Sequence, residues 1–82
     1  LIDYAVAIDA NRAVKGVEVL SYRESYGGEI RSRAWLKQFE GKTASSTISL
    51  NKDISNIGGA TLSSRHVTEG VKRILVTIDV TQ

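Results

Sequence analysis

The chain has 82 residues, no cysteine and one histidine, and its 11 Lys and Arg against 9 Asp and Glu give a formal net charge of +2. This length allows one domain with a modest core, and the lack of Cys and of further His excludes disulfide scaffolds and zinc sites. Acidic and basic residues alternate along most of the chain, which predicts a solvated surface and no nucleic-acid partner.

The composition also bears on where the chain belongs. With 41% hydrophobic residues it is not expected to be disordered. It has no apolar run near the roughly 20 residues of a membrane span, and no signal-peptide pattern. It begins at Leu1 and contains no Met. We therefore expect residues 1–82 to be a single domain and a piece of a longer protein, with any export signal or anchor outside it.

The first 24 residues predict a hairpin. Apolar side chains alternate with smaller or polar ones in residues 2–8, which is typical of a half-buried strand. Residues 9–12 contain Asp and Asn, which favour a turn. Residues 14–24 predict a second strand, with Val17 and Val19 on one face and Leu20 and Tyr22 on the other.

The middle of the chain predicts a helix and a short strand. A glycine pair interrupts residues 24–29, and a helix is expected over residues 30–40, with Trp35, Leu36 and Phe39 on one face as core residues. Gly41 lies where a helix C-cap glycine is expected. Residues 46–50 predict a third short strand, followed by a connecting segment over 54–57.

The last third predicts the principal helix, over residues 65–76. Its apolar residues fall at helical spacing and are Val67, Val71, Ile74, Leu75 and Ile78. Gly70 either weakens this helix by about 1 kcal/mol or marks close packing. Residues 76–80 are mostly β-branched, so the end of the helix is ambiguous: they are able to fray or become extended. The expected fold class is α+β: a small antiparallel sheet, made of the hairpin plus short strands, packed against two helices.

Residues 58–64 open this helix with Gly58, Gly59 and Ala60, and then with the hydroxyls of Thr61, Ser63 and Ser64. Glycine lets the backbone approach a ligand, and a helix start offers unpaired N–H groups and the positive end of a dipole. This combination suits a phosphate. The alternative is an ordinary N-cap, made by hydroxyls that bind backbone N–H groups.

The same stretch, residues 52–64, resembles the FMN-binding domain family, which includes flavin subunits of the Rnf complex and of the sodium-pumping NADH:quinone reductase. The family carries Asp-x-x-Ser/Thr-Gly-Ala-Thr before a hydroxyl-rich helix start, and Gly59, Ala60 and Thr61 match it. Ser55 replaces the family's Asp, and Gly58 replaces its Ser/Thr.

The resemblance covers about residues 3–74. Residues 35–42 match a second family run, Trp-Leu-x-Gln-Phe-x-Gly-Lys. Glu24 with Gly27 or Gly28 is similar to the family's Glu-Thr-Pro-Gly-like loop, in which Tyr26 stands in place of the proline. Through this loop, Glu24 and the glycine pair are implied to lie near the flavin ring.

The resemblance implies an FMN-binding, electron-transfer domain that carries electrons and is not a self-contained enzyme. It implies that FMN binds at Gly59, Ala60, Thr61, Leu62, Ser63 and Ser64, either non-covalently or through a phosphoester to Thr61 made by a separate flavin transferase. Arg65 is placed either to add charge near the phosphate or to be solvated, and His66 is expected at the surface or half-buried. The implied partners are other redox subunits, at an extracytoplasmic, membrane-associated location reached through parts outside this chain.

Two other functions remain open. One is a flavin-free, degenerate relative that acts as an interaction or sensory module, which the departures at Ser55 and Gly58 favour. The other is a small binder of phosphate ligands or nucleic acid. If the domain does carry FMN, the two departures predict slow or incomplete covalent loading.

Overall fold

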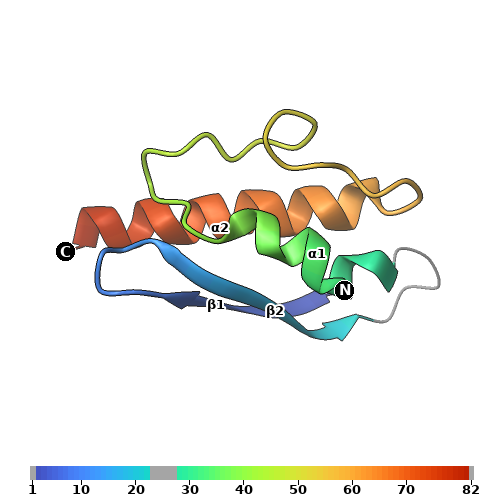
Figure 1. The fold of residues 1–82 in the computed structure, drawn as a ribbon, viewed down its shortest axis with the longest axis horizontal. Coiled ribbons are helices and arrows are strands. Elements are labelled where there is room, and N and C mark those ends of the chain that lie inside the picture. The colour runs from blue at the N-terminus through green and yellow to red at the C-terminus, as the bar shows by residue number, and fades with distance from the viewer. Residues whose placement is uncertain (1, 23–27, 82) are drawn as a thin grey trace.

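The structure, a computed structural model, describes residues 2–22 and 28–81. Its elements are β1 (Ile2–Ile8), β2 (Val14–Tyr22), the 3-10 helix η1 (Gly28–Arg31), α1 (Arg33–Leu36), the 3-10 helix η2 (Lys37–Phe39) and α2 (Thr61–Thr81). β1 and β2 form a two-stranded antiparallel sheet, and α2 runs along it (Figure 1). The predicted α+β class, with an N-terminal hairpin and two helical segments, is confirmed.

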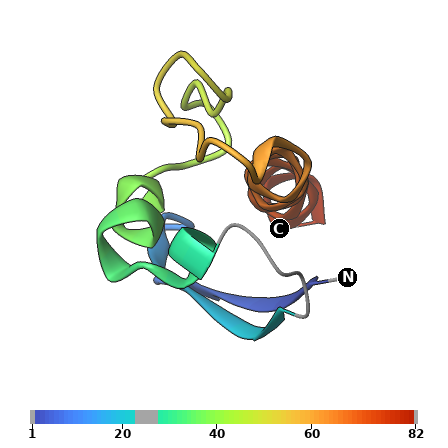
Figure 2. The ribbon, with the colours of Figure 1, turned by 90° about the vertical axis from the view of Figure 1, so that its right-hand side faces the viewer.

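The elements enclose one core. Figure 2 shows the hairpin on one side, α2 on a second, the α1 region opposite α2, and the segment 41–60 closing the remaining side. The most deeply buried apolar side chains come from every one of these parts and are Val14, Ile30, Phe39, Ile54, Val67, Val71 and Leu75. The predicted apolar stripe of the last helix therefore packs against both the sheet and the long connecting segment.

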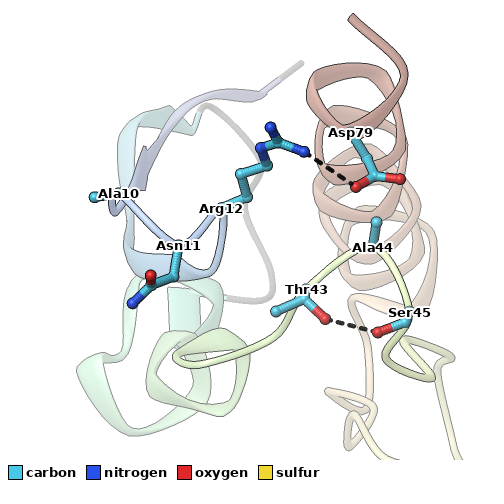
Figure 3. Close-up of a pocket in the computed structure, with 7 residues that line it drawn as sticks. All are labelled: Ala10, Asn11, Arg12, Thr43, Ala44, Ser45 and Asp79. Carbon is cyan, nitrogen blue, oxygen red and sulfur yellow. Dashed lines mark hydrogen bonds and ion pairs between the residues drawn. The ribbon is translucent and has the colours of Figure 1, made fainter. Parts of the chain in front are cut away.

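The hairpin turn forms as its residues predict. The Asp9 carboxylate accepts hydrogen bonds from the backbone N–H groups of Asn11 at 2.8 Å and Ala13 at 3.0 Å. Arg12 adopts a positive φ of 63° and its guanidinium lies 3.7 Å from the carboxylate of Asp79, near the end of α2 (Figure 3). The hairpin turn is thus placed at the C-terminal end of α2.

The prediction for the faces of the second strand is half wrong. Val19 pairs with Tyr4 and Ser21 pairs with Asp3, so Leu20 is an extra residue in a β-bulge. The bulge resets the alternation. Leu20 is therefore exposed, whereas Tyr22 returns to the face of Val19 and packs against the core.

The predicted helix over residues 30–40 is not continuous. Ser32 has an extended backbone, with φ −61° and ψ 129°, and divides η1 from α1. α1 then tightens into η2, which ends before Gly41, whose φ is 84°. The burial of Trp35, Leu36 and Phe39 is confirmed because the short helices keep these side chains on one side.

The predicted strand over residues 46–50 is wrong. Within the described residues this stretch makes a single parallel bridge, between Leu50 and Ile54. Its neighbour is α2, whose backbone groups are already paired, so no strand edge is available to it. The side chain of Lys72 instead donates hydrogen bonds to the carbonyls of Ala44 at 2.7 Å and Ser46 at 2.8 Å.

The long helix differs from its prediction at both ends. It begins at Thr61 and continues to Thr81, so residues 76–80 are helical and are not extended. Gly70 marks close packing, since it is buried against the side chain of Tyr4. No helix in the described ranges is long and apolar enough to span a membrane.

Candidate functional site

The first turn of α2 has the properties of an anion site. The backbone N–H groups of Thr61, Leu62 and Ser63 precede the first intrahelical bond, which Ser64 N–H makes to the Ala60 carbonyl at 2.9 Å. Across the described parts of the chain, no acceptor bonds to these three groups. The first turn also contains no acidic residue. Its positive dipole end is therefore open to an anion.

The approach to this turn is sterically clear. Gly58 and Gly59 are exposed, and a Cβ added at either would meet no atom within 4 Å. Gly59 has a φ of 85°, a conformation that favours glycine. Ala60 is buried, and its N–H donates to the Ile57 carbonyl at 2.9 Å. The glycines thus leave space beside a fixed helix start.

The three hydroxyl groups of this turn differ in accessibility. Thr61 is exposed, and its hydroxyl oxygen accepts a hydrogen bond from the Asn56 side-chain amide at 3.1 Å. Ser63 is half-buried and accepts a hydrogen bond from the Tyr22 hydroxyl at 3.2 Å. Ser64 is fully buried. Thr61 is therefore the hydroxyl most open to chemistry from outside.

Ser64 corrects one expectation. Its hydroxyl donates to the Ala60 carbonyl at 2.8 Å, inside the helix, so it does not cap a backbone N–H as the N-cap alternative expects. The reason is that α2 begins at Thr61 rather than Arg65, which places Ser64 on the buried face. Leu62 is 83% exposed and offers this turn only its backbone N–H and an apolar surface.

The second strand brings its end to the same place. Tyr22, the last residue of β2, donates its hydroxyl hydrogen bond to Ser63 in the first turn of α2. The predicted ring-binding loop follows Tyr22 in the sequence. Glu24 and Gly27 lie outside the described residues, and Gly28 is the first residue of η1. The residue that precedes this loop in the sequence thus contacts the first turn of α2 through its side chain.

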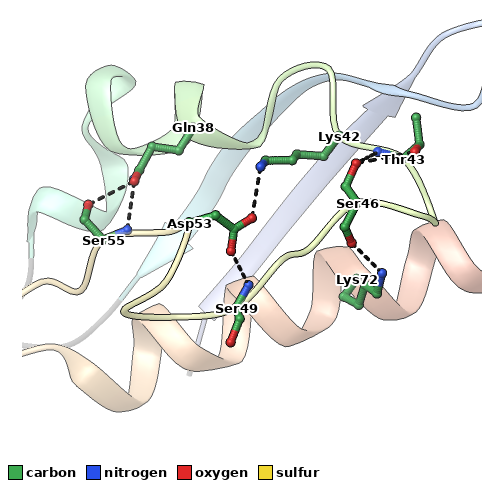
Figure 4. Close-up of polar contacts among 8 residues, drawn as sticks. All are labelled: Gln38, Lys42, Thr43, Ser46, Ser49, Asp53, Ser55 and Lys72. Carbon is green, nitrogen blue, oxygen red and sulfur yellow. Dashed lines mark hydrogen bonds and ion pairs between the residues drawn. The ribbon is translucent and has the colours of Figure 1, made fainter.

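A clamp that sequence reasoning missed holds Ser55, and Figure 4 shows its bonds to Gln38. The side-chain oxygen of Gln38 accepts hydrogen bonds from the Ser55 N–H at 2.8 Å and hydroxyl at 3.0 Å. The Trp35 indole N–H donates to the Ser55 carbonyl at 2.8 Å. These partners are separated by 17 and 20 positions, so no local pattern predicts them.

The rest of the connecting segment is fixed by charged groups (Figure 4). The Lys42 ammonium lies 2.9 Å from the Asp53 carboxylate, whose other oxygen accepts the Ser49 N–H at 2.8 Å. Burial acts to raise the pKa of Asp53, but the hydrogen bonds from Lys42 and Ser49 outweigh it and hold that pKa below its usual value. The carboxylate therefore stays ionised at neutral pH.

The remaining residues considered in the sequence lie either at the surface or in the core. Arg65 is exposed. His66 is exposed, as predicted, and its ring meets that of Tyr4 edge-on at 6.0 Å. Trp35 and Phe39 are core residues, as predicted, with ring centroids 5.3 Å apart.

Two cavities lie away from the start of α2. One, of about 690 Å³, is formed between the hairpin turn, residues 43–45 and Asp79, at the other end of the helix (Figure 3). The other, of about 590 Å³, lies between the sheet and the α1 region and is lined by Ala5, Ala7, Arg31 and Lys37 among others. Neither contains a residue of the helix start.

Comparison with known proteins identifies the family of the chain. A family model described as "FMN-binding domain" matches residues 1–76. The resemblance seen in the sequence is thereby confirmed at the level of the family, and FMN is indicated as the cofactor, covalent or not. No curated protein and no solved structure matches.

Proposed function

Because the chain belongs to the FMN-binding domain family, we propose that it is an electron carrier that holds FMN by its phosphate at the first turn of α2, attached through a phosphoester to Thr61. The observation that carries the proposal is the position of Thr61. It is the exposed hydroxyl of the turn, at the first residue of a 21-residue helix.

The residues present fit a phosphate. At the first turn of α2, three backbone N–H groups have no acceptor within the described residues, and the turn contains no acidic side chain. The approach to this turn over Gly58 and Gly59 is uncovered. The half-buried Ser63 hydroxyl is an additional polar group at this point. When bound, the flavin ring supplies the redox chemistry, and the protein positions and tunes it.

Attachment requires help from outside the domain. A threonine hydroxyl is a weak nucleophile unless a base removes its proton. Apart from Asn56, no side chain in the described ranges bonds to the Thr61 hydroxyl, and an amide is not a base. We therefore propose a flavin transferase that uses FAD. As Thr61 Oγ bonds to the phosphorus on the FMN side, the pyrophosphate P–O bond breaks, AMP leaves, and the Thr61 proton passes to a transferase base.

The surroundings of the domain are a further part of this proposal. Family resemblance supports an extracytoplasmic position, on the periplasmic or cell-surface side, with membrane association through parts outside this chain. It also supports other redox subunits or domains as electron donors and acceptors. The domain then acts as a carrier between them and needs no substrate site of its own.

Loading by a transferase tests the site. We expect protein produced with a flavin transferase and FAD to show a flavin absorption band and a fraction with an intact mass raised by one FMN less one water, incomplete because of the departures at Ser55 and Gly58. Thr61→Ala should abolish the mass increase, and the matched Ser63→Ala should retain it. Loading that survives Thr61→Ala would refute the attachment site.

A titration tests phosphate recognition without a covalent bond. Unloaded protein should bind FMN more tightly than riboflavin, because only FMN carries the phosphate. Equal affinities would contradict a phosphate site at the helix start. Binding of neither flavin, together with no covalent loading, would favour the flavin-free interaction module that Ser55 and Gly58 suggest.

A further inference from the structure

We infer that Asn56 is a positioning residue for Thr61, and that the clamp of Trp35 and Gln38 on Ser55 holds Asn56 in place. The inference deepens the proposed attachment at Thr61 and rests on it for its functional consequence. Its structural part concerns only contacts within this chain. It starts from the 3.1 Å hydrogen bond between the Asn56 amide nitrogen and Thr61 Oγ.

This bond joins two exposed side chains that are five positions apart. Between freely moving side chains in water, such a bond contributes little, because ordering the two groups opposes it. It becomes a persistent restraint only if the backbone on both sides is already fixed. The strength of this restraint therefore depends on how firmly the backbones of Asn56 and Thr61 are held.

Both ends are fixed by their neighbours. Ser55, just before Asn56, has its N–H, hydroxyl and carbonyl all bonded to Gln38 and Trp35 at 2.8–3.0 Å. Ile57, just after it, is buried and accepts the Ala60 N–H. Thr61 itself begins a long helix that packs into the core. The Asn56 bond thus spans two anchored backbones.

The Gln38 side chain is itself held. Its amide nitrogen donates to the Trp35 carbonyl at 2.8 Å, which directs its oxygen toward Ser55. Trp35 is 6% exposed and stacks edge-on against the fully buried Phe39. The chain of contacts therefore runs from the core, through Gln38 and Ser55, to Asn56.

The direction of the Asn56 bond has a chemical consequence. A hydroxyl has one O–H and two acceptor lone pairs. The amide donates to one lone pair, which leaves the O–H for an outside base and the second lone pair for attack. Asn56 thereby selects one rotamer of Thr61 and leaves its reactive oxygen facing out. It takes no proton, so it positions the nucleophile without activating it.

Nuclear magnetic resonance on the unloaded protein tests the positioning directly. Three-bond couplings should report a single χ1 rotamer for Thr61 in the natural sequence. Asn56→Ala should average these couplings, and Gln38→Ala should do so in part. Gln38→Glu keeps the acceptor for Ser55 but loses the donor to the Trp35 carbonyl, so its couplings should lie between those of Gln38→Ala and those of the natural sequence. Lys52→Ala, an exposed change in the same segment, serves as the control and should alter nothing.

Transferase kinetics test the consequence. Asn56→Ala should slow covalent loading by roughly two- to tenfold, the rate equivalent of one neutral hydrogen bond. Non-covalent FMN affinity and melting temperature should stay close to those of the natural sequence, which separates positioning from a merely structural role. Gln38→Glu should load faster than Gln38→Ala.

The results distinguish the inference from the proposed attachment. Averaged Thr61 couplings in the natural sequence, or unchanged couplings or loading in Asn56→Ala, would overturn the positioning role. A fixed Thr61 rotamer that Asn56→Ala releases, in a protein that no transferase loads, would confirm the positioning and remove the attachment instead.

Discussion

Gly70 offers a test of packing in which two effects of opposite sign compete. It is buried in the middle of α2 and faces Tyr4 of β1. A Cβ at this position would clash with the Tyr4 hydroxyl oxygen and lie 3.0 Å from its Cζ. Burial raises the pKa of that hydroxyl, against the opposing charge of Arg73, so it is neutral at pH 7. The clash is therefore steric.

The expected change in the free energy of unfolding follows from helix propensity and overpacking, which oppose each other in Gly70→Ala. In an exposed helix interior, Gly→Ala raises the free energy of unfolding by about 1 kcal/mol. Overpacking a well-filled site lowers it by about 1–3 kcal/mol. We expect Gly70→Ala to be destabilising by about 1 kcal/mol on balance. For a domain of this size that lowers the melting temperature by about 4–8 °C.

A double-mutant cycle assigns the loss to this contact. Tyr4→Phe removes the clashing oxygen, so the Gly70→Ala change should cost less in that background, with a coupling of at least about 0.5 kcal/mol in urea titrations. Gly16→Ala, whose added Cβ meets no atom within 4 Å, is the control for adding a methyl group. If Gly70→Ala stabilised the domain by about 1 kcal/mol and were additive with Tyr4→Phe, the packing argument would be refuted.

Three further predictions concern the connecting segment. Gly58→Ala should change the free energy of unfolding by less than about 1 kcal/mol, whereas Gly59→Ala should lower it by about 1–2 kcal/mol in the same titration, because only Gly59 has a positive φ. The pKa of Asp53 is lowered on folding, so the stability it supplies is present above about pH 4 and lost as pH falls through its folded value; Asp53→Asn should flatten that acid limb of the stability curve. Lys72→Met leaves two backbone carbonyls without their donor and should lower the free energy of unfolding by about 1–3 kcal/mol, measured by thermal unfolding.

The features that could be predicted from the sequence are those with a local cause. Alternation over residues 2–8 and the Asp9 turn fix the hairpin, and helical spacing from Val67 to Ile78 fixes the buried face of α2. The glycine and hydroxyl pattern likewise marks the helix start, although the helix begins four residues earlier than predicted. In each case, the deciding interactions join residues close in sequence.

The features that could not be predicted depend on distant partners or on a single inserted residue. The bulge at Leu20 moves the Tyr22 side chain to the other face of the strand, and no residue type in the strand signals that bulge. That reversal matters for the site, because it lets the Tyr22 hydroxyl reach Ser63. The strand predicted over residues 46–50 fails because its neighbour is α2, which has no strand edge to offer; the Ser46 carbonyl accepts a hydrogen bond from the Lys72 side chain instead.

Ser55 departs from the family's motif, and its surroundings in the structure suit a serine. From the sequence, its departure from the family's Asp is a loss of charge near the attachment site proposed at Thr61. In the structure, its N–H and hydroxyl both donate to the Gln38 oxygen. An aspartate here has no hydroxyl to donate, and its carboxylate lies beside the Gln38 oxygen. The two oxygens repel each other unless the Gln38 amide turns over, and that turn breaks its hydrogen bond to the Trp35 carbonyl. The serine and the Gln38 orientation are therefore matched, and the departure maintains the clamp that leads to Thr61.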